Sequence, residues 1–204
     1  YGSKSPDTIR EFSTQIVDYL VENDVKMIII ACNTATAMAL DTLKERYPDI
    51  PILGVIDPTV QKVVGDGCGK VGVIATKATI GSDVYGKSLR QYNPDMKVYS
   101  LACPVFVPLV EEGFIEGEIM ELAVKHYMDR FVAENDFDNL ILGCTHYPLV
   151  AEHIRKLYPQ LTLYNSSAEV ISVAEKILRE RDMLAESSDI KDRYYASDLS
   201  DNFI

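Results

Sequence analysis

Residues 27–34 read Met-Ile-Ile-Ile-Ala-Cys-Asn-Thr, an apolar run that ends in a cysteine and two polar side chains. A second run of the same kind, Leu-Ile-Leu-Gly-Cys-Thr-His, occupies residues 140–146. Short apolar runs are typical of buried strands in a parallel sheet, whose two faces are both covered. Ligands bind at the carboxyl ends of strands in open α/β sheets. The two runs therefore predict one site that is lined by two thiols, Cys32 and Cys144.

Helical and strand patterns alternate along the rest of the chain, which predicts an α/β fold with mostly parallel sheets. A first helix is expected to begin at Ser5-Pro6, because serine caps a helix and proline suits its first position. It is expected to end at Asn23-Asp24. Further helices are expected over 34–47, 60–64, 79–91, 116–134, 148–157 and 168–185. Strands are expected over 25–31, 50–55, 70–75, 98–102, 139–143 and 161–164, with a strand-like stretch at 193–196.

Two turns, at residues 55–57 and 164–166, are the best candidates for domain boundaries. They predict a discontinuous first domain, residues 1–55 plus 165–204, and a second domain that covers residues 56–164. Each domain would be an α/β unit with one of the two cysteines at a strand end.

The composition excludes several classes of protein. The chain has 204 residues, is 47% hydrophobic and carries a net charge of −11, which argues against a nucleic-acid-binding face. No apolar run approaches the roughly 20 residues of a membrane helix, and no signal peptide is expected. The four cysteines form no C-x-x-C pair, so we expect free thiols in a cytoplasmic protein and no metal site.

The pair of thiols predicts acid/base chemistry. A lone cysteine after an apolar strand is usually a core residue, but two cysteines in matched settings suggest a shared function. Cys68 and Cys103 lack that setting and are expected to be structural. His146 lies two residues after Cys144, where an imidazole can accept the proton of a thiol.

Polar residues follow several of the predicted strands and suggest an anion site. Any one of these side chains is most simply a helix cap, whereas groups at equivalent strand ends favour a shared carboxylate pocket. The groups are Asn33-Thr34, Thr76 with Thr79, Thr145, and the opening Tyr1-Gly2-Ser3. The carboxylates Glu111 and Glu112 would pass for solvated surface on their own.

Four stretches resemble the glutamate racemases of the aspartate/glutamate racemase superfamily. Residues 31–37, Ala-Cys-Asn-Thr-Ala-Thr-Ala, and residues 142–149, Leu-Gly-Cys-Thr-His-Tyr-Pro-Leu, are similar to the two cysteine signatures of that family. Residues 103–113 resemble an internal family segment, and residues 1–5 resemble its substrate loop. The resemblance implies two three-layer α/β units that are related by a pseudo-twofold axis, with the active site between them.

The resemblance also implies roles for individual residues. Cys32 and Cys144 would be the catalytic acid/base thiols of a cofactor-independent glutamate racemase, His146 would assist Cys144, and Glu111 would support the same side. The α-carboxylate and ammonium of glutamate would be held by Asn33, Thr34 and Thr145. The side-chain carboxylate would contact Tyr1, Gly2 and Ser3, with Thr76 and Thr79 as further substrate residues. We expect a homodimer that supplies D-glutamate for peptidoglycan and cell shape.

One family feature is expected upstream of Tyr1. The family's N-terminal strand and Asp-Ser-Gly motif precede that position, and the Asp supports the first cysteine. We therefore expect the functional protein to carry this segment, and a protein that starts at Tyr1 to have little activity.

Other functions are possible on the sequence alone. The superfamily includes aspartate and hydantoin racemases and one-thiol decarboxylases. A non-catalytic amino-acid-binding protein would keep the pocket but would need no second thiol. A cysteine hydrolase would leave the second matched cysteine unexplained.

Overall fold

The structure is a computed structural model that describes residues 1–185 and 191–197. The helices are α1 (Pro6–Glu22), α2 (Asn33–Arg46), α3 (Ile56–Gly65), α4 (Lys77–Ser82), α5 (Val84–Tyr92), α6 (Phe106–Glu111), α7 (Glu118–Glu134), the 3₁₀ helix η1 (Tyr147–Val150), α8 (Ala151–Leu157) and α9 (Ser166–Glu180). The strands are β1 (Ile28–Ile30), β2 (Ile52–Gly54), β3 (Lys70–Ala75), β4 (Lys97–Ala102), β5 (Asn139–Gly143) and β6 (Thr162–Asn165).

The strands form two parallel sheets. Sheet A contains β1 and β2, with Ile29 opposite Leu53. Sheet B has the order β4-β3-β5-β6, and every neighbouring pair in it is parallel. The α/β class with parallel sheets that the sequence predicts is confirmed. Because the strands in each sheet run the same way, the residues that follow them gather at one edge.

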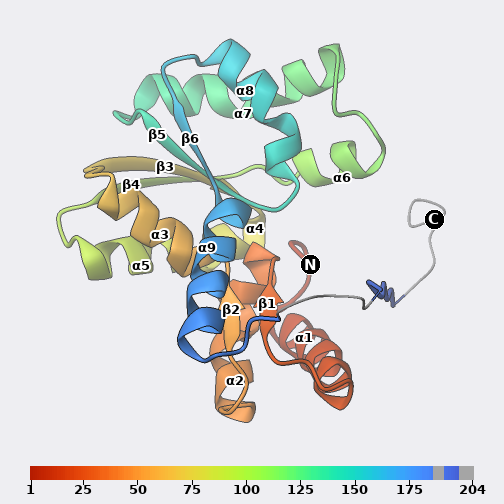
Figure 1. Cartoon of the computed structure of the whole chain (residues 1–204). Coiled ribbons are helices and arrows are strands. Elements are labelled where there is room, and N and C mark those ends of the chain that lie inside the picture. Colours follow the sequence, from red (N-terminus) through yellow and green to blue (C-terminus); the bar gives the residue numbers. More distant parts are fainter. Residues whose placement is uncertain (186–190, 198–204) are drawn as a thin grey trace.

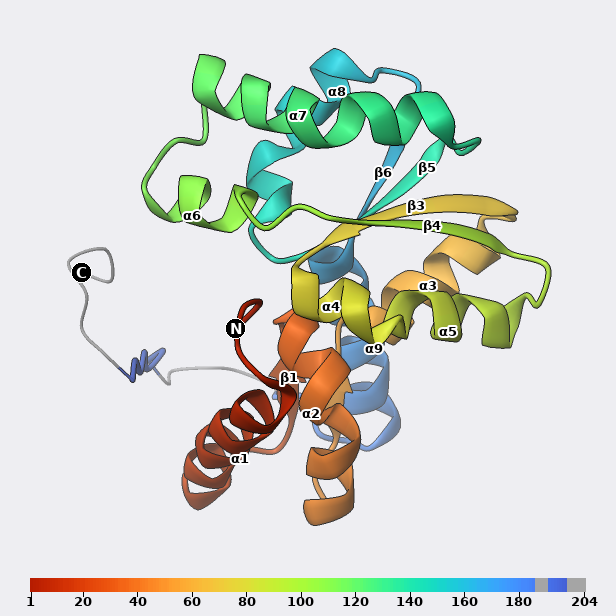
Figure 2. The same cartoon turned by 180° about the vertical axis from the view of Figure 1, so that it is seen from behind.

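Sheet B is covered on both faces, which explains its uninterrupted apolar strands. Alternate side chains point to opposite faces, so Ile74, Leu140 and Leu142 pack under α7 and α8. Val71, Val73 and Ile141 face the other way and pack against α3 and α5. Figure 2 shows α7 across one face of this sheet, with α3 and α5 on the other.

Sheet A lies beside α1, α2 and α9 in the lower part of Figure 1. Its core contains Val17 of α1, Ala39 and Leu43 of α2, and the strand residues Ile28 and Ile52. The amino-terminal turn and the start of α2 lie between this part and sheet B. The two sheets therefore present their carboxyl ends to a common region.

Several strand-end residues also cap the helix that follows. The Ala35 N–H donates to the Cys32 Sγ at 3.4 Å, and the Thr79 N–H donates to the Thr76 Oγ1 at 3.3 Å. Ser5 caps α1 as predicted, with its Oγ 3.3 Å from the Thr8 nitrogen. Caps fix the direction of the polar side chains at these turns, because each side chain must reach back to a backbone N–H.

The structure differs from the sequence prediction at several places. The predicted helix over 79–91 is broken at Asp83, whose φ of 52° interrupts the helix between α4 and α5. The last long helix ends at Glu180 rather than at residue 185, and residues 193–196 form no strand. Helix α6 was missed because Pro104 and Pro108 suggest a loop, although proline is tolerated in a first helical turn.

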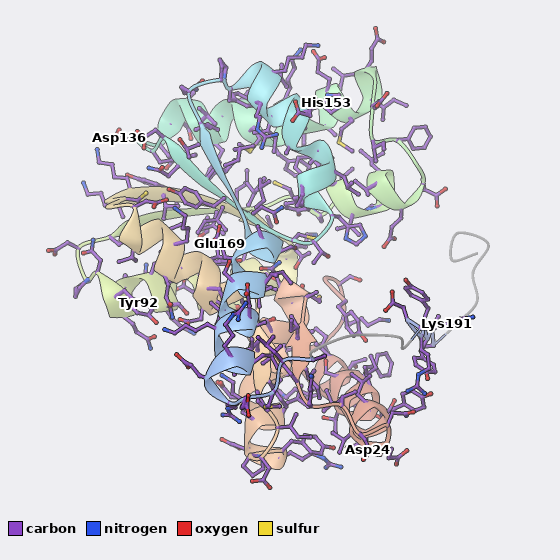
Figure 3. All side chains as sticks on the ribbon, in the orientation of Figure 1. Asp24, Tyr92, Asp136, His153, Glu169 and Lys191 are labelled. Carbon is purple, nitrogen blue, oxygen red and sulfur yellow. The ribbon has the colours of Figure 1, made fainter. Side chains whose placement is uncertain are left out.

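The amino-terminal edge of sheet B lies away from the region that the strand ends share. Lys70 at the start of β3 forms an ion pair with Asp136 just before β5, and Figure 3 shows Asp136 at the outside of the molecule. Within the described ranges, none of the helices is long and apolar enough to cross a membrane.

Candidate active site

Cys32 lies between β1 and the first turn of α2. The side chain is half-buried, and its sulfur accepts the Ala35 N–H at 3.4 Å. The amino end of a helix carries unpaired N–H groups and a partial positive charge, which favour an anionic group such as a thiolate. Cys32 lies at this turn because the apolar strand β1 ends only two residues before it.

Cys144 follows β5 directly and is 6% exposed. Its sulfur lies 3.9 Å from Nδ1 of His146, and Nε2 of the same ring lies 3.3 Å from Oε1 of Glu111. With the ring proton on Nε2 facing the carboxylate, Nδ1 is free to accept the thiol proton. The structure therefore brings together three of the predicted catalytic residues, Cys144, His146 and Glu111.

The two thiols are close enough to influence one another. Burial raises the pKa of Cys144, the backbone N–H groups of His146 and Tyr147 act against this, and a negative charge on Cys32 raises that pKa further. A negative charge on one sulfur therefore favours the protonated form of the other. This is the arrangement that a base and an acid on opposite sides of one carbon require.

Three threonine hydroxyls from the ends of both sheets meet in one cluster. The Thr34 Oγ1 lies 3.0 Å from the Thr76 Oγ1 and 3.1 Å from the Thr79 Oγ1, and the latter two are 3.1 Å apart. Thr34 comes from the start of α2, whereas Thr76 and Thr79 come from the end of β3 and from α4. All three residues are buried. The cluster provides rotatable O–H donors that can turn toward a carboxylate.

The amino-terminal turn packs onto the same cluster. A Cβ on Gly2 would lie 2.6 Å from the Thr76 Cβ, so only glycine fits here without a shift. The Gly2 carbonyl accepts the Ala78 N–H at 3.3 Å. The pKa of Tyr1 is raised by burial and then by a charge on Cys32, which places the phenol near that thiol. The turn thus closes over the threonine cluster.

Two of the predicted substrate-binding residues lie at the edge of the hydrogen-bonded site. Ser3 lies exposed in the amino-terminal turn, and Thr145 is half-buried in the turn between Cys144 and His146. Neither is joined by a described hydrogen bond to the threonine cluster or to a thiol. Glu112, on the exposed end of α6, is also outside this group of contacts.

The sequence prediction missed two residues that contact Asn33. The Tyr85 hydroxyl donates to the Asn33 Oδ1 at 2.6 Å, and the Asn33 Nδ2 donates to the Ser166 Oγ at 3.1 Å. Ser166 follows β6 and shares the strand-end position of the other candidates, a signal that could have found it. Tyr85 lies inside α5 and carries no such signal.

The arrangement defines an α/β protein with one thiol after a strand of each of its two parallel sheets. All four cysteines lie in the described ranges and are free. Among the described residues, His, Cys, Asp and Glu side chains form no group of three that could hold a metal ion.

Comparison with known proteins gives the family. Residues 2–174 match the model of the Asp/Glu/hydantoin racemase family. The chain is 46% identical over 179 residues to a glutamate racemase from Sulfurihydrogenibium sp. (strain YO3AOP1), covering 87% of this chain and 68% of the relative. It is 38% identical to the glutamate racemase of Geobacter metallireducens, covering 100% of this chain and 76% of the relative.

A solved structure agrees with these matches. The glutamate racemase of Francisella tularensis, determined in complex with D-glutamate, superimposes with a TM-score of 0.94 at 40% identity. That match covers 100% of this chain and 76% of the other. The chain therefore belongs to the Asp/Glu/hydantoin racemase family, among its glutamate racemases.

Proposed function

We propose that this protein racemises glutamate, interconverting the L and D enantiomers with Cys32 and Cys144 as the acid/base pair and without a cofactor. The observation that carries the proposal is the pair of strand-end thiols, one at a helix amino end and one beside an imidazole–carboxylate pair. The D-glutamate complex of the Francisella relative supports glutamate as the substrate.

The proton transfer conserves atoms and electrons. One cysteine, as thiolate, removes the α-proton and becomes a thiol, while the electron pair of the C–H bond moves into the carboxylate. The electron pair then returns to the α-carbon and takes a proton from the opposite thiol on the other face, and that thiol becomes the thiolate. The roles of Cys32 and Cys144 reverse with the handedness of the substrate.

The remaining residues hold the substrate in this proposal. Asn33, Thr34 and Thr145 bind the α-carboxylate and ammonium, so that N–H and O–H donors stabilise the charge that develops in the transition state. Thr76 and Thr79 complete the hydroxyl cluster around Thr34. Tyr1, Gly2 and Ser3 contact the side-chain carboxylate, supported by the packing of the amino-terminal turn on this cluster.

The wider context follows from the family. We propose that the protein supplies D-glutamate for peptidoglycan in the cytoplasm, where its four free thiols would stay reduced. We also propose a homodimer, because several large apolar side chains on and before α7 are exposed, among them Phe114 at 44% and Leu122 at 65%. Light scattering of the purified protein tests the dimer.

The domain division is also a proposal. Residues 1–55 plus 165–204 would form one domain and residues 56–164 the other, a division that the two separate sheets support. Parts of the carboxyl-terminal segment, residues 186–190 and 198–204, lie outside the described residues.

Substrate profiling tests the function. The full-length protein should racemise D- and L-glutamate, followed by circular dichroism, and should place deuterium at the α-carbon in heavy water. Aspartate is the second candidate, because the matching family model also includes aspartate racemases. We expect aspartate to react about 10- to 200-fold more slowly, since the pocket must discriminate one methylene. Glutamate binding without deuterium incorporation would instead identify a binding protein.

A further inference from the structure

A chain of buried hydrogen bonds links the two thiol-bearing segments. The Tyr85 hydroxyl donates to Asn33 Oδ1 at 2.6 Å, and Asn33 Nδ2 donates to the Ser166 Oγ at 3.1 Å. The Ser166 hydroxyl in turn donates to the Leu142 carbonyl at 3.4 Å. Asn33 is the neighbour of Cys32, and Leu142 precedes Cys144 by two positions on the same strand end. The chain therefore runs from one catalytic segment to the other.

The direction of each bond follows from the donors available. A serine hydroxyl has a single proton, and Ser166 gives it to the Leu142 carbonyl. Ser166 must then accept from Asn33, which requires the NH₂ group of that amide to face it. The amide oxygen is consequently on the side of Tyr85, whose pKa burial raises, so that the phenol keeps its proton as a donor.

This arrangement leaves one N–H of Asn33 uncommitted. The amide nitrogen carries two protons, and one of them is bonded to Ser166. The second proton remains for a substrate that lies between the thiols. Tyr85, Asn33 and Ser166 are 3%, 2% and 0% exposed, so water cannot readily replace any member of the chain. A rotated Asn33 amide would have to break two buried hydrogen bonds.

We infer that Tyr85 and Ser166 are positioning residues that fix the Asn33 amide and the spacing of Cys32 from Cys144. The inference rests on the proposed function, because it assigns the chain a task only if both thiols act on one substrate carbon. Neither residue touches the reacting atoms in this account. They act through Asn33 and through the end of β5.

Removal of the Tyr85 hydroxyl should misalign the thiols without preventing substrate binding. We expect Tyr85→Phe to lower kcat about tenfold or more, because misplacement of about 1 Å costs up to about 100-fold in rate. KM should change less than kcat, since Ser166 still holds the NH₂ group of the Asn33 amide, whereas alignment of both thiols is needed only in the transition state. The loss in kcat/KM should be equal in both directions, because the equilibrium constant between enantiomers is unity.

A matched control separates positioning from general stability. The Tyr158 hydroxyl also donates at 2.6 Å, but to Asp129 Oδ1, outside the hydrogen-bond chain that joins the two thiol-bearing segments. Tyr158→Phe therefore removes an equally short bond from a tyrosine that is also buried. We expect it to lower the unfolding midpoint and to leave kcat unchanged at a temperature where the protein is fully folded.

A second variant keeps the inference testable if Tyr85→Phe does not fold. Ser166→Ala should also lower kcat with little change in KM. If both residues act through Asn33, the double variant should be no slower than the slower single variant, whereas independent losses would multiply.

The outcomes distinguish the inference from the proposed function. Wild-type protein that fails to racemise glutamate would overturn the proposed function. Active wild-type protein with Tyr85→Phe and Ser166→Ala both within twofold of its kcat would overturn the inference alone. Losses that multiply in the double variant would also overturn the inference alone. So would a loss of the same size in Tyr158→Phe.

Discussion

The two cysteines that we propose as the acid/base pair occupy equivalent strand ends but have different surroundings. Cys32 is half-buried at the start of the 14-residue helix α2, with the Ala35 N–H on its sulfur. Cys144 is 6% exposed, is followed by a turn and a short 3₁₀ helix, and has His146 beside it and Glu111 behind that ring. One thiol thus lies at the amino end of a helix, and the other has a side chain beside it that can carry its proton.

The difference shows how two similar units can supply unlike partners for one reaction. An α-proton transfer needs a charged sulfur on one face and a protonated sulfur on the other. Burial and the charge on Cys32 both raise the pKa of Cys144, which keeps it protonated while Cys32 is charged. We expect His146 to help when Cys144 must act as the base.

The largest expected effect comes from removing either thiol. Cys32→Ala and Cys144→Ala should each lower racemisation by at least about 1,000-fold, within the range for loss of a general acid or base. Polarimetry with D- and L-glutamate measures this. Cys68→Ala is the control, because Cys68 contacts the Tyr164 hydroxyl at 3.3 Å and is not in the site. A single alanine variant with wild-type rates would remove the case for two thiols.

Loss of the imidazole should be the next largest effect. His146→Asn should lower kcat/KM about 100-fold, equally for the two enantiomers because their equilibrium constant is unity. The two enantiomers should differ instead in how much deuterium the recovered substrate takes up. This uptake should fall more for the enantiomer that Cys144 deprotonates. Nuclear magnetic resonance of the α-proton measures it.

The matched control is His153→Asn, because the ring of His153 contacts the Ile115 carbonyl, away from the thiols. Glu111→Gln should cause a smaller loss in the same direction, because it removes only the partner of the ring. Equal deuterium incorporation from both enantiomers in His146→Asn would show that the imidazole does not serve Cys144 in particular.

The threonine hydroxyl cluster should contribute equally to the binding of both glutamate enantiomers. Thr34→Val should raise KM about tenfold for both enantiomers, because a hydrogen bond to a charged group is worth about 1.5 kcal/mol or more. Initial rates over a range of glutamate concentrations provide the measurement. Thr14→Val, which loses a bond to the Arg10 carbonyl on α1, should leave KM unchanged. A change in KM for only one enantiomer would tie Thr34 to one thiol.

Chemical labelling gives the smallest effect and tests the thiols without substrate. Because burial raises the pKa of Cys144, less of it is thiolate at a given pH than in the unfolded chain. Iodoacetamide at pH 7.5 should therefore label Cys32 before Cys144, and labelling of Cys144 should rise about tenfold per pH unit below its pKa. Peptide mass spectrometry follows both sites, with urea-unfolded protein as the control. Equal rates in the folded protein would contradict the comparison.

The sequence predicts the strand ends well because the signals there are local. The bounds of β5 agree with the prediction, since the apolar run and the following polar residues lie within a few positions of one another. The polar groups of Thr34, Thr76 and Thr79 were predicted to share one edge, and the structure brings their hydroxyls within 3.1 Å of each other. Parallel pairing makes that placement follow from topology.

Features that depend on packing between distant segments are not visible in the sequence. Tyr85 reaches Asn33 only because α5 packs against sheet B near the start of α2, and its helical pattern looks like that of any core residue. The contact of Glu111 with His146 similarly depends on α6, a helix of six residues that two prolines conceal. Long-range contacts of this kind require the tertiary structure.

Hydrogen exchange by the two alanine variants tests the central claim most directly. In heavy water, Cys32→Ala and Cys144→Ala should each exchange the α-proton of one glutamate enantiomer without net racemisation, because the remaining thiol removes a proton and returns a deuteron on the same face. The two variants should select opposite enantiomers. Exchange of the same enantiomer by both variants, or racemisation by either at the wild-type rate, would contradict the assignment of one thiol to each face.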